Sequence, residues 1–558
     1  MEVPFAYRGR SGVVSGSSGD ALCFAANLKR DQVAFAGDLR HPVRFRELFS
    51  ALHDVVVSEL RFQPKDHSAY KAWRAQQDAQ RRALYQGALE QATEAIQARS
   101  VKPMPPDLEQ RFRTQHRLYW DARRAWSNKL MREDSALWAR LRPCDPVVTV
   151  ADDQVLFECF SKDESSYGAL GVDRDAFGTG SDAAYGTTNV DYSWELYDHI
   201  QGLRSYHPTR FAVAPEGIAV QVGAAPAYHE EKIDLPQSWL RGFAQIGAAA
   251  VLPATRVPIS RDALYAVLAW LRRHREKSGP RAIRVELIGG RPVRLVLEPW
   301  EQAIVLPDQV WNGPDLAPIR VWGRRRLLVL ARTLPFVDRA ELHLLGTGMP
   351  WFVVLRCGEM RFTLGLSGWT TNDWTRSAAL DLLAPPAIPE EREIQRVAEL
   401  LHQQRSCTHA QLQPVVGDAS RLGACLVHLA GTGQIVHDLA NSRYRWRQVV
   451  SRALGEAEKG PDHPELVASR NLLRERAVRK LSVSDQGTAG ALLTATVEGQ
   501  ECELLLNRDG QLRRAKCDCS WFRAGGIRKG PCRHLLAVRL AHQQERDGIT
   551  SSVWGLGR

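Results

Sequence analysis

Hydrophobic positions follow two different periods along this chain, and the first change of period comes early. Near residues 22–28 and 32–35 the apolar residues fit the two-residue repeat of strands. The next apolar residues recur at the spacing of one helix face, at Phe45, Leu48, Phe49, Leu52 and Val56. This pattern predicts an N-terminal α+β unit over residues 1–65.

Helical periodicity dominates residues 66–142. Two long helical stretches, 68–98 and 107–141, are separated by a segment that contains Pro103, Pro105 and Pro106. Proline lacks the amide donor and clashes with the preceding turn, so we expect the two stretches to fold into a helical hairpin. The second stretch is rich in arginine, and a solvated face is favoured over a nucleic-acid surface.

Both periods occur in residues 143–388. Strand-like segments include 155–160, 211–222 and 351–366, and residues 261–274 are amphipathic at helical spacing. This mixture predicts a large α+β body. One of its polar segments, 160–168, places Asp163 and Glu164 among hydroxyls, where carboxylates could act as acid and base. It has no histidine partner or metal-ligand spacing, so a capped helix start or an exposed loop is favoured.

Residues 389–452 predict three helices followed by a two-stranded hairpin. The helices are expected at 390–404, 408–416 and 419–429, and the hairpin pairs 434–437 with 444–447. This is the layout of a winged-helix domain, in which the third helix can enter the major groove of DNA.

Arginines mark the two parts of this unit that would face nucleic acid. Arg421 lies in the third helix, and Arg443, Arg445 and Arg447 share one face of the wing strand, where they could meet an anion. The third helix has few polar groups to read base edges, so a protein-docking winged helix remains an alternative.

A charged helical connector over residues 453–480 leads to the last unit, 481–558. Residues 501–507 and 511–516 alternate like two strands of a hairpin and Asp509-Gly510 is the turn between them. The second strand leads into Cys517-Asp518-Cys519, then twelve residues, then Cys532-Arg533-His534, where a helical pattern begins. Three thiolates and one imidazole are the donors of a closed tetrahedral zinc site. We therefore predict one Zn²⁺ at Cys517, Cys519, Cys532 and His534.

The order Cys-x-Cys, spacer, Cys-x-His on strand, strand and helix resembles the SWIM zinc finger. The resemblance covers about residues 481–545 and implies a ββα zinc finger. The other cysteines, Cys502 among them, stand singly in apolar contexts and are expected to be core thiols.

Composition limits the remaining possibilities. With 558 residues and 44% hydrophobic content, the chain should form several globular domains. The first twelve residues lack the apolar run of a signal peptide, and no stretch approaches the about 18 apolar residues of a membrane span. Zinc-type cysteine spacing without a disulfide framework indicates a reducing cytoplasm. The lack of an apolar span predicts no membrane partner.

The charge distribution suggests an anionic partner. The net charge is +11, and the zinc-finger unit adds a second group of basic residues, Arg513, Arg514, Lys516, Arg528 and Lys529. Clustered Arg and Lys bind phosphate by releasing counterions, so DNA or RNA is a candidate ligand. No nucleophile, base and orienting residue can be assembled, which predicts a protein that is not an enzyme.

The whole arrangement also resembles bacterial SWIM-containing proteins that accompany a MoxR-type AAA ATPase and a von Willebrand A domain protein. The segments that carry this resemblance are 160–168, 187–193 and 362–374. That resemblance implies an accessory subunit and assigns no catalytic residue. The sequence thus predicts an α+β multidomain, zinc-binding protein whose winged-helix-like and SWIM modules bind nucleic acid. The alternative is a protein-interaction adaptor or scaffold for a AAA ATPase complex.

Overall fold

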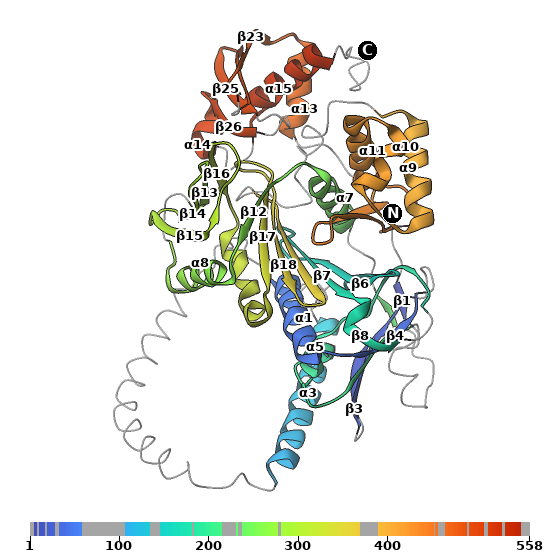
Figure 1. Ribbon diagram of the computed structural model, residues 1–558. Helices are drawn as coiled ribbons and strands as arrows, with labels where there is room; N and C mark the ends of the chain where they lie inside the picture. The colour runs from blue at the N-terminus through green and yellow to red at the C-terminus, as the bar shows by residue number, and fades with distance from the viewer. Residues whose placement is uncertain are drawn as a thin grey trace, which may run out of the picture. The chain divides into compact units, whose positions relative to one another are not determined.

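The structure, a computed structural model, separates the chain into two compact units, residues 1–59 with 143–558 and residues 60–142 (Figure 1). It describes residues 5–7, 11–16, 19–27, 33–58, 107–133, 145–180, 183–214, 230–232, 237–276, 281–368, 389–450, 452–455, 464–487, 490–506, 512–526 and 531–547.

The smaller unit is described through one long helix, α3 (Leu108–Glu133). This helix falls within the predicted stretch 107–141. The side chains of Leu118, Tyr119 and Trp126 are each more than half exposed on it. The first predicted helix and the proline-rich turn of the helical hairpin lie outside the described residues.

The N-terminal strands belong to a five-stranded sheet that later segments complete. Its order is β2-β3-β10-β4-β8, with β10 parallel to β3 and antiparallel to β4. The predicted unit 1–65 is therefore not separate from the body, because β8 and β10 come from residues 177–214. The strands are β2 (Gly12–Gly16), β3 (Gly19–Ala25), β4 (Phe35–Leu39), β8 (Phe177–Gly180) and β10 (Thr209–Ala214).

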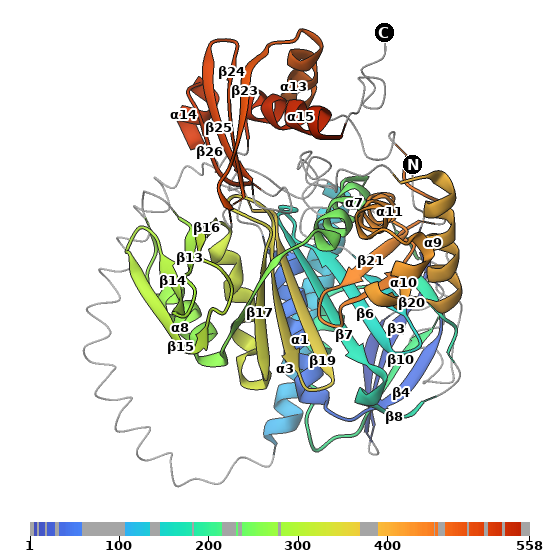
Figure 2. The same cartoon turned by 45° about the horizontal axis from the view of Figure 1, so that its top comes forward.

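An eight-stranded antiparallel sheet forms the centre of the larger unit, in the order β12-β17-β18-β19-β7-β6-β5-β9. Helices cover both of its faces (Figure 2). A Cβ placed on Gly168 would lie 3.1 Å from Leu52 of α1 (Pro42–Val57), and one on Gly365 would lie 2.9 Å from Ile246 of α7 (Gln237–Val251). Burial on both faces explains the continuous apolar runs of its central strands.

The strands of this sheet are β5 (Val147–Val150), β6 (Gln154–Phe160), β7 (Ser166–Asp173), β9 (Gly186–Asn189), β12 (Thr255–Ile259), β17 (Arg339–Leu344), β18 (Trp351–Cys357) and β19 (Met360–Leu366). Beside it lies a four-stranded sheet, β15-β14-β13-β16, against which α8 packs. These elements are β13 (Ile283–Leu287), β14 (Pro292–Leu297), β15 (Gln302–Val310), β16 (Leu316–Val321) and α8 (Arg261–Arg273).

Shorter elements complete the body. They are a strand pair, β1 (Phe5–Tyr7) with β11 (Glu230–Lys232), the helix α5 (Trp194–Ile200), and the 3-10 helices η1 (Arg174–Ala176), η2 (Arg324–Arg332) and η3 (Leu334–Phe336). The mixed α+β character expected for residues 143–388 is present in the described part of this segment.

Three helices and a hairpin occupy the described part of residues 389–452. The third helix starts where the Asp418 side chain accepts from the backbone N–H of Arg421, and the second where Thr408 and Gln411 form a capping box. A short strand, β20, joins the hairpin in a sheet of order β20-β22-β21. The elements are α9 (Glu391–Gln404), β20 (Ser406–Thr408), α10 (His409–Val416), α11 (Ala419–Gly431), β21 (Ile435–Asp438) and β22 (Arg443–Trp446).

A four-stranded sheet of order β23-β24-β25-β26 and three helices form the last part of the chain. The predicted connector ends as a helix at Arg474, and it packs on the last helix through Leu466, Leu536 and Leu540. The elements are α13 (Pro464–Arg474), β23 (Val478–Asp485), β24 (Ala491–Val497), β25 (Gln500–Leu506), β26 (Leu512–Cys517), α14 (Ser520–Gly525) and α15 (Arg533–Asp547). Across the described ranges, no helix combines the length and apolar character needed to cross a membrane.

Candidate metal centre

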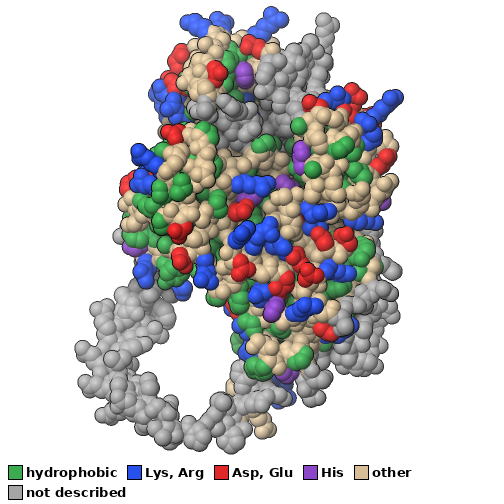
Figure 3. Space-filling model, in the orientation of Figure 1, with side chains coloured by type: hydrophobic (Ala, Val, Ile, Leu, Met, Phe, Trp, Pro, Cys, Tyr) green, Lys and Arg blue, Asp and Glu red, His purple; other side chains and the backbone are tan. Residues whose placement is uncertain are grey.

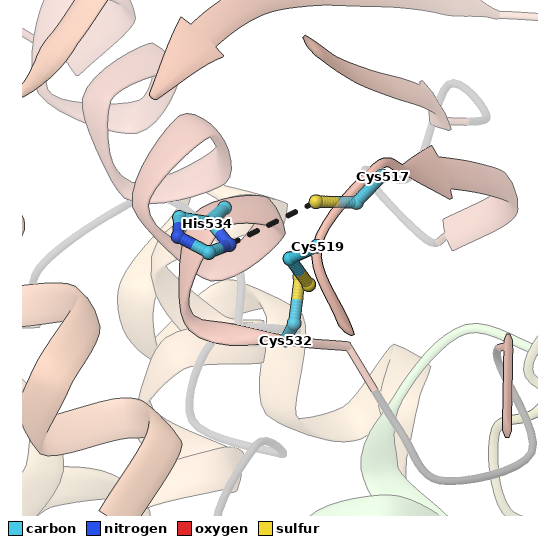
Figure 4. Close-up of side chains that lie close together, drawn as sticks. All are labelled: Cys517, Cys519, Cys532 and His534. Atoms are coloured by element: carbon cyan, nitrogen blue, oxygen red, sulfur yellow. Dashed lines mark hydrogen bonds between the residues drawn. The ribbon is translucent and has the colours of Figure 1, made fainter. Parts of the chain in front are cut away.

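Four side chains converge between the end of a strand and the start of a helix (Figure 4). Cys517 ends β26, Cys519 caps α14 by accepting from the N–H of Phe522, and Cys532 and His534 lie at the start of α15. Their ligand atoms all lie within 4.8 Å of one another, and all four residues are buried. Ligands of a tetrahedral zinc with Zn–S bonds of about 2.3 Å would be about 3.8 Å apart. The four residues thus fit a Cys₃His zinc site and would hold Zn²⁺ with every position filled by protein.

Hydrogen bonds and burial shift the pKa values of the three cysteine ligands in opposite directions. Those from Cys502 and Cys532, with one from His534, lower the pKa of Cys517 well below its ordinary value. The bond to Cys517 in turn raises the pKa of Cys532, and burial raises that of Cys519. Zinc binding therefore displaces protons from the remaining thiols, which couples metal affinity to pH.

Cys502 lies next to the zinc site, and this contact was not predicted from the sequence. It is buried, as expected, but it faces Cys517 across the β25–β26 pair with a Sγ–Sγ distance of 3.8 Å. It is not one of the four residues whose ligand atoms lie together. Its S–H is placed to donate to the Cys517 sulfur. The sequence signal was present, because both cysteines occupy facing positions of the predicted hairpin.

The helix α15, which begins between the ligands Cys532 and His534, is fixed to α13 by one carboxylate. Glu465, which is buried, accepts from the backbone N–H of Arg533 at 2.8 Å and from its guanidinium at 2.6 and 3.2 Å. An acidic group at this end of a helix also interacts favourably with the helix dipole. Arg533 therefore links α15 to the connector helix.

Residues 501–543, which include all four ligands, match the family model described as SWIM zinc finger. The chain carries a SWIM zinc finger. The Cys₃His cluster supports Zn²⁺ as its cofactor.

Comparison with curated proteins gives no match. Among solved structures, proliferating cellular nuclear antigen from Entamoeba histolytica is 12% identical, over 40% of this chain and 89% of that chain, with a TM-score of 0.28. The C-terminal region of FEN-1 bound to A. fulgidus PCNA is also 12% identical, over 41% of this chain and 91% of that chain, with a TM-score of 0.28. At these TM-scores neither likeness bears on the fold or function of this chain.

The SWIM finger presents part of its predicted basic surface to solvent. Arg514 and Lys516 are exposed on β26, and Lys516 lies 3.7 Å from Glu503. The exposed Trp521 lies on α14, which contacts β26. The side chain of Arg513 and the residues Arg528 and Lys529 lie outside the described part of the structure.

In the unit of α9 to β22, Arg421 and Arg443 are held by groups of the same unit. Arg421 forms ion pairs with Glu390 at 2.9 Å and with Glu393 at 2.6 Å. Arg443 donates to the hydroxyl and carbonyl oxygens of Ser406 at 3.1 and 3.2 Å. Both side chains remain partly exposed.

The structure corrects the role predicted for Arg445. It lies on β22, but its side chain points into the protein and not toward solvent. Arg445 is 2% exposed, contacts both carboxylate oxygens of Asp153 at 2.6 and 2.8 Å, and donates to Asp438 at 2.9 Å. Because this arginine is buried and already paired with carboxylates, it is not available to bind phosphate.

Arg447 needs the same correction. It has no exposed surface, lies 3.2 Å from the equally buried Glu158, and stacks over the ring of Phe243 at 4.9 Å. Glu158 also accepts from the hydroxyl of Tyr167 at 2.7 Å. Arg445 and Arg447 thus fix the hairpin β21–β22 to β6 of the large sheet and to α7.

The third helix of this unit also faces the body. α11 packs on α7, and a Cβ placed on Gly247 would lie 3.0 Å from the carbonyl oxygen of Ala430. The two helices approach closely at this glycine, and a larger residue there would require Ala430 to shift by a few tenths of an ångström. In this arrangement the apolar face of α11 is covered by protein and does not enter a DNA groove.

Within the polar segment 160–168, residues 161–165 form a tight turn, and the remaining residues belong to β6 and β7. The prediction of a capped helix start or an exposed loop there was wrong. Asp163 is 2% exposed and accepts from Ser161 at 2.7 Å, from the N–H of Ser165 at 3.2 Å, and from Arg326 at 2.8 Å. These partners give the carboxylate a structural role in closing the turn.

Proposed function

We propose that this chain is a non-enzymatic, cytoplasmic zinc protein whose SWIM finger binds single-stranded nucleic acid. One observation carries the proposal. The exposed indole of Trp521 lies on α14, next to β26 with the exposed cations Arg514 and Lys516. An aromatic face beside basic side chains is the combination that binds single strands, because bases stack on the ring while cations follow the phosphates.

The zinc site supports this role indirectly. Its ligands tie both ends of residues 520–531, the segment that contains Trp521, Arg528 and Lys529. Binding of Zn²⁺ fixes the two ends of this basic segment relative to β26, which lowers the conformational cost of presenting it to a ligand.

The surface charge of the body supports a nucleic-acid contact that is confined to the SWIM finger. On the face drawn in Figure 3, basic and acidic side chains are interspersed over the body and do not form one continuous basic stripe. The buried positions of Arg445 and Arg447 remove two cations from the surface. We propose that residues 389–452 are a winged-helix fold used for docking within the chain.

A salt-titrated binding assay with the full-length protein tests the proposal. Replacing Arg514 and Lys516 by alanine should weaken binding and reduce the slope of log affinity against log salt by about one to two units. Trp521→Ala should cost about 1–3 kcal/mol for single strands. The matched control is Arg479→Ala with Lys480→Ala, which removes two exposed cations from β23 at the other edge of the sheet.

Two results would overturn this function. One is the absence of binding at low salt by wild-type, zinc-loaded protein. The other is an equal loss in the β26 and β23 variants, which would show that net charge alone governs the interaction.

The second candidate is an adaptor for a AAA ATPase or a von Willebrand A type protein. Exposed Leu118, Tyr119 and Trp126 on α3 favour it, because apolar side chains more than half exposed on one helix are typical of protein contacts. A stable interface needs about 800 Å² per partner. Tagged protein from its host should recover such a chain in stoichiometric amount, and Leu118→Ser with Trp126→Ser should reduce the yield. Recovery without either partner, but with nucleic acid, would contradict the adaptor.

A further inference from the structure

The imidazole of His534 has a different partner on each nitrogen. Nδ1 lies on the metal side, 3.8 Å from the Cys517 sulfur, while Nε2 lies 3.3 Å from Oε2 of Glu498. With zinc on Nδ1 and a neutral ring, the proton must be on Nε2, which then donates to this carboxylate. We propose that Glu498 is a positioning residue for the zinc centre and sets the orientation of His534 and its affinity for Zn²⁺.

The backbone brings Glu498 to this place by a tight two-residue turn. Val497 pairs with Gln500, so Glu498 and Gly499 form the two-residue loop between β24 and β25. Their φ angles are 48° and 77°, both positive. Such loops match the twist of a hairpin and favour Asn-Gly or Asp-Gly.

Glutamate is a poor choice for the turn itself. A residue other than glycine in the left-handed region costs about 1 kcal/mol or more, and Glu lacks the short side chain that makes Asn and Asp tolerable there. A strained position that carries the carboxylate facing a metal ligand points to function in that side chain.

The chemistry of the contact explains what it would do. A carboxylate that accepts from the free nitrogen of a ligating histidine fixes its tautomer and ring direction and makes the other nitrogen a stronger donor. Loss of such a partner typically lowers metal affinity about 10- to 100-fold. Glu498 lies outside the matched range 501–543, so the zinc centre extends beyond the SWIM motif.

Zinc affinity of the full-length protein, measured by competition with a chromophoric chelator, tests the proposal. Glu498→Ala should lower the affinity about 10-fold or more. Glu498→Asn is the decisive variant, because it improves the turn yet has too short a side chain to reach His534. It should keep the hairpin folded and still lose affinity. Glu501→Gln is the matched control, since it removes a charge from the same hairpin at a residue that contacts Thr496.

A second measurement separates orientation from stability. In zinc-loaded protein, the Nε2 proton of His534 should exchange slowly with water in the wild type and faster in Glu498→Asn, as followed by NMR of ¹⁵N-labelled histidine. Wild-type affinity in Glu498→Asn would overturn the proposal, even if Glu498→Ala binds zinc weakly, because the residue would then serve only the turn. An equal loss in Glu501→Gln would overturn it as well.

Discussion

Replacing Arg447 by methionine should loosen the hairpin β21–β22 from the large sheet. Arg447 and Glu158 both have 0% exposure, and their charged atoms lie 3.2 Å apart. Methionine keeps much of the volume over Phe243 but leaves the Glu158 carboxylate buried without its cation. Breaking a buried pair in this way costs about 3–5 kcal/mol. The hydroxyl of Tyr167 still donates to Glu158, which places the expected loss near the lower end.

Hydrogen exchange of the amides in β21 and β22 is the appropriate assay, because a chain of several units has no single unfolding midpoint. A loss of about 3 kcal/mol corresponds to exchange roughly a hundred-fold faster if the hairpin opens locally. Adding Glu158→Gln should recover at least half of the loss, since the glutamine accepts from Tyr167 without a charge.

The control is Arg443→Met on the same strand. Arg443 is partly exposed and donates to Ser406, so its loss should cost about 1 kcal/mol. The burial reasoning would be refuted if Arg447→Met and Arg443→Met had equal effects. It would also be refuted if Arg447→Met weakened nucleic-acid binding while exchange stayed unchanged.

Three more outcomes are expected. Chelation of zinc should open residues 512–547 to protease and leave the eight-stranded sheet intact, whereas full zinc content by elemental analysis in Cys517→Ser with Cys532→Ser would contradict the ligand set. Burial lowers the pKa of His53 to about 3, so as the pH falls the unfolded chain takes up a proton before the folded chain does. The free energy of unfolding should therefore decrease as the pH falls from about 6.5 to 3, by at most about 1.4 kcal/mol per pH unit. Unfolding measured against pH should show a smaller slope in His53→Gln. Glu465→Ala should cost the SWIM finger about 1–2 kcal/mol by freeing Arg533, and unchanged exchange at the start of α15 would oppose this.

Local features of the chain were predictable from the sequence. The zinc ligands lie within eighteen consecutive residues, so spacing alone specified them. The predicted strands 501–507 and 511–516 differ from β25 and β26 by one residue at each end. The three helices before β21 were similarly close, because each begins at a capping residue and ends near glycine or at a polar segment.

Long-range contacts explain the main error. Alternation placed Arg443, Arg445 and Arg447 on one face of the predicted wing strand, but periodicity cannot say whether a face meets solvent or protein. The deciding partners, Asp153 and Glu158, come about 290 residues earlier in the chain. Cys502 and Glu498 were missed for a similar reason, since their roles depend on which neighbours the hairpins bring to them.

The pairing of β3 with β10 has a consequence for synthesis of the protein. Leu22, Phe24 and Ala25 of β3 are fully buried in the finished sheet, yet the parallel partner strand spans Thr209–Ala214. At about 5–20 residues per second, a ribosome needs roughly 10 to 30 seconds to pass from residue 58 to residue 214. Throughout that interval the apolar strand β3 lacks its partner β10. The nascent chain is therefore expected to depend on chaperone protection of its first sixty residues, and fragments that stop before residue 214 should aggregate.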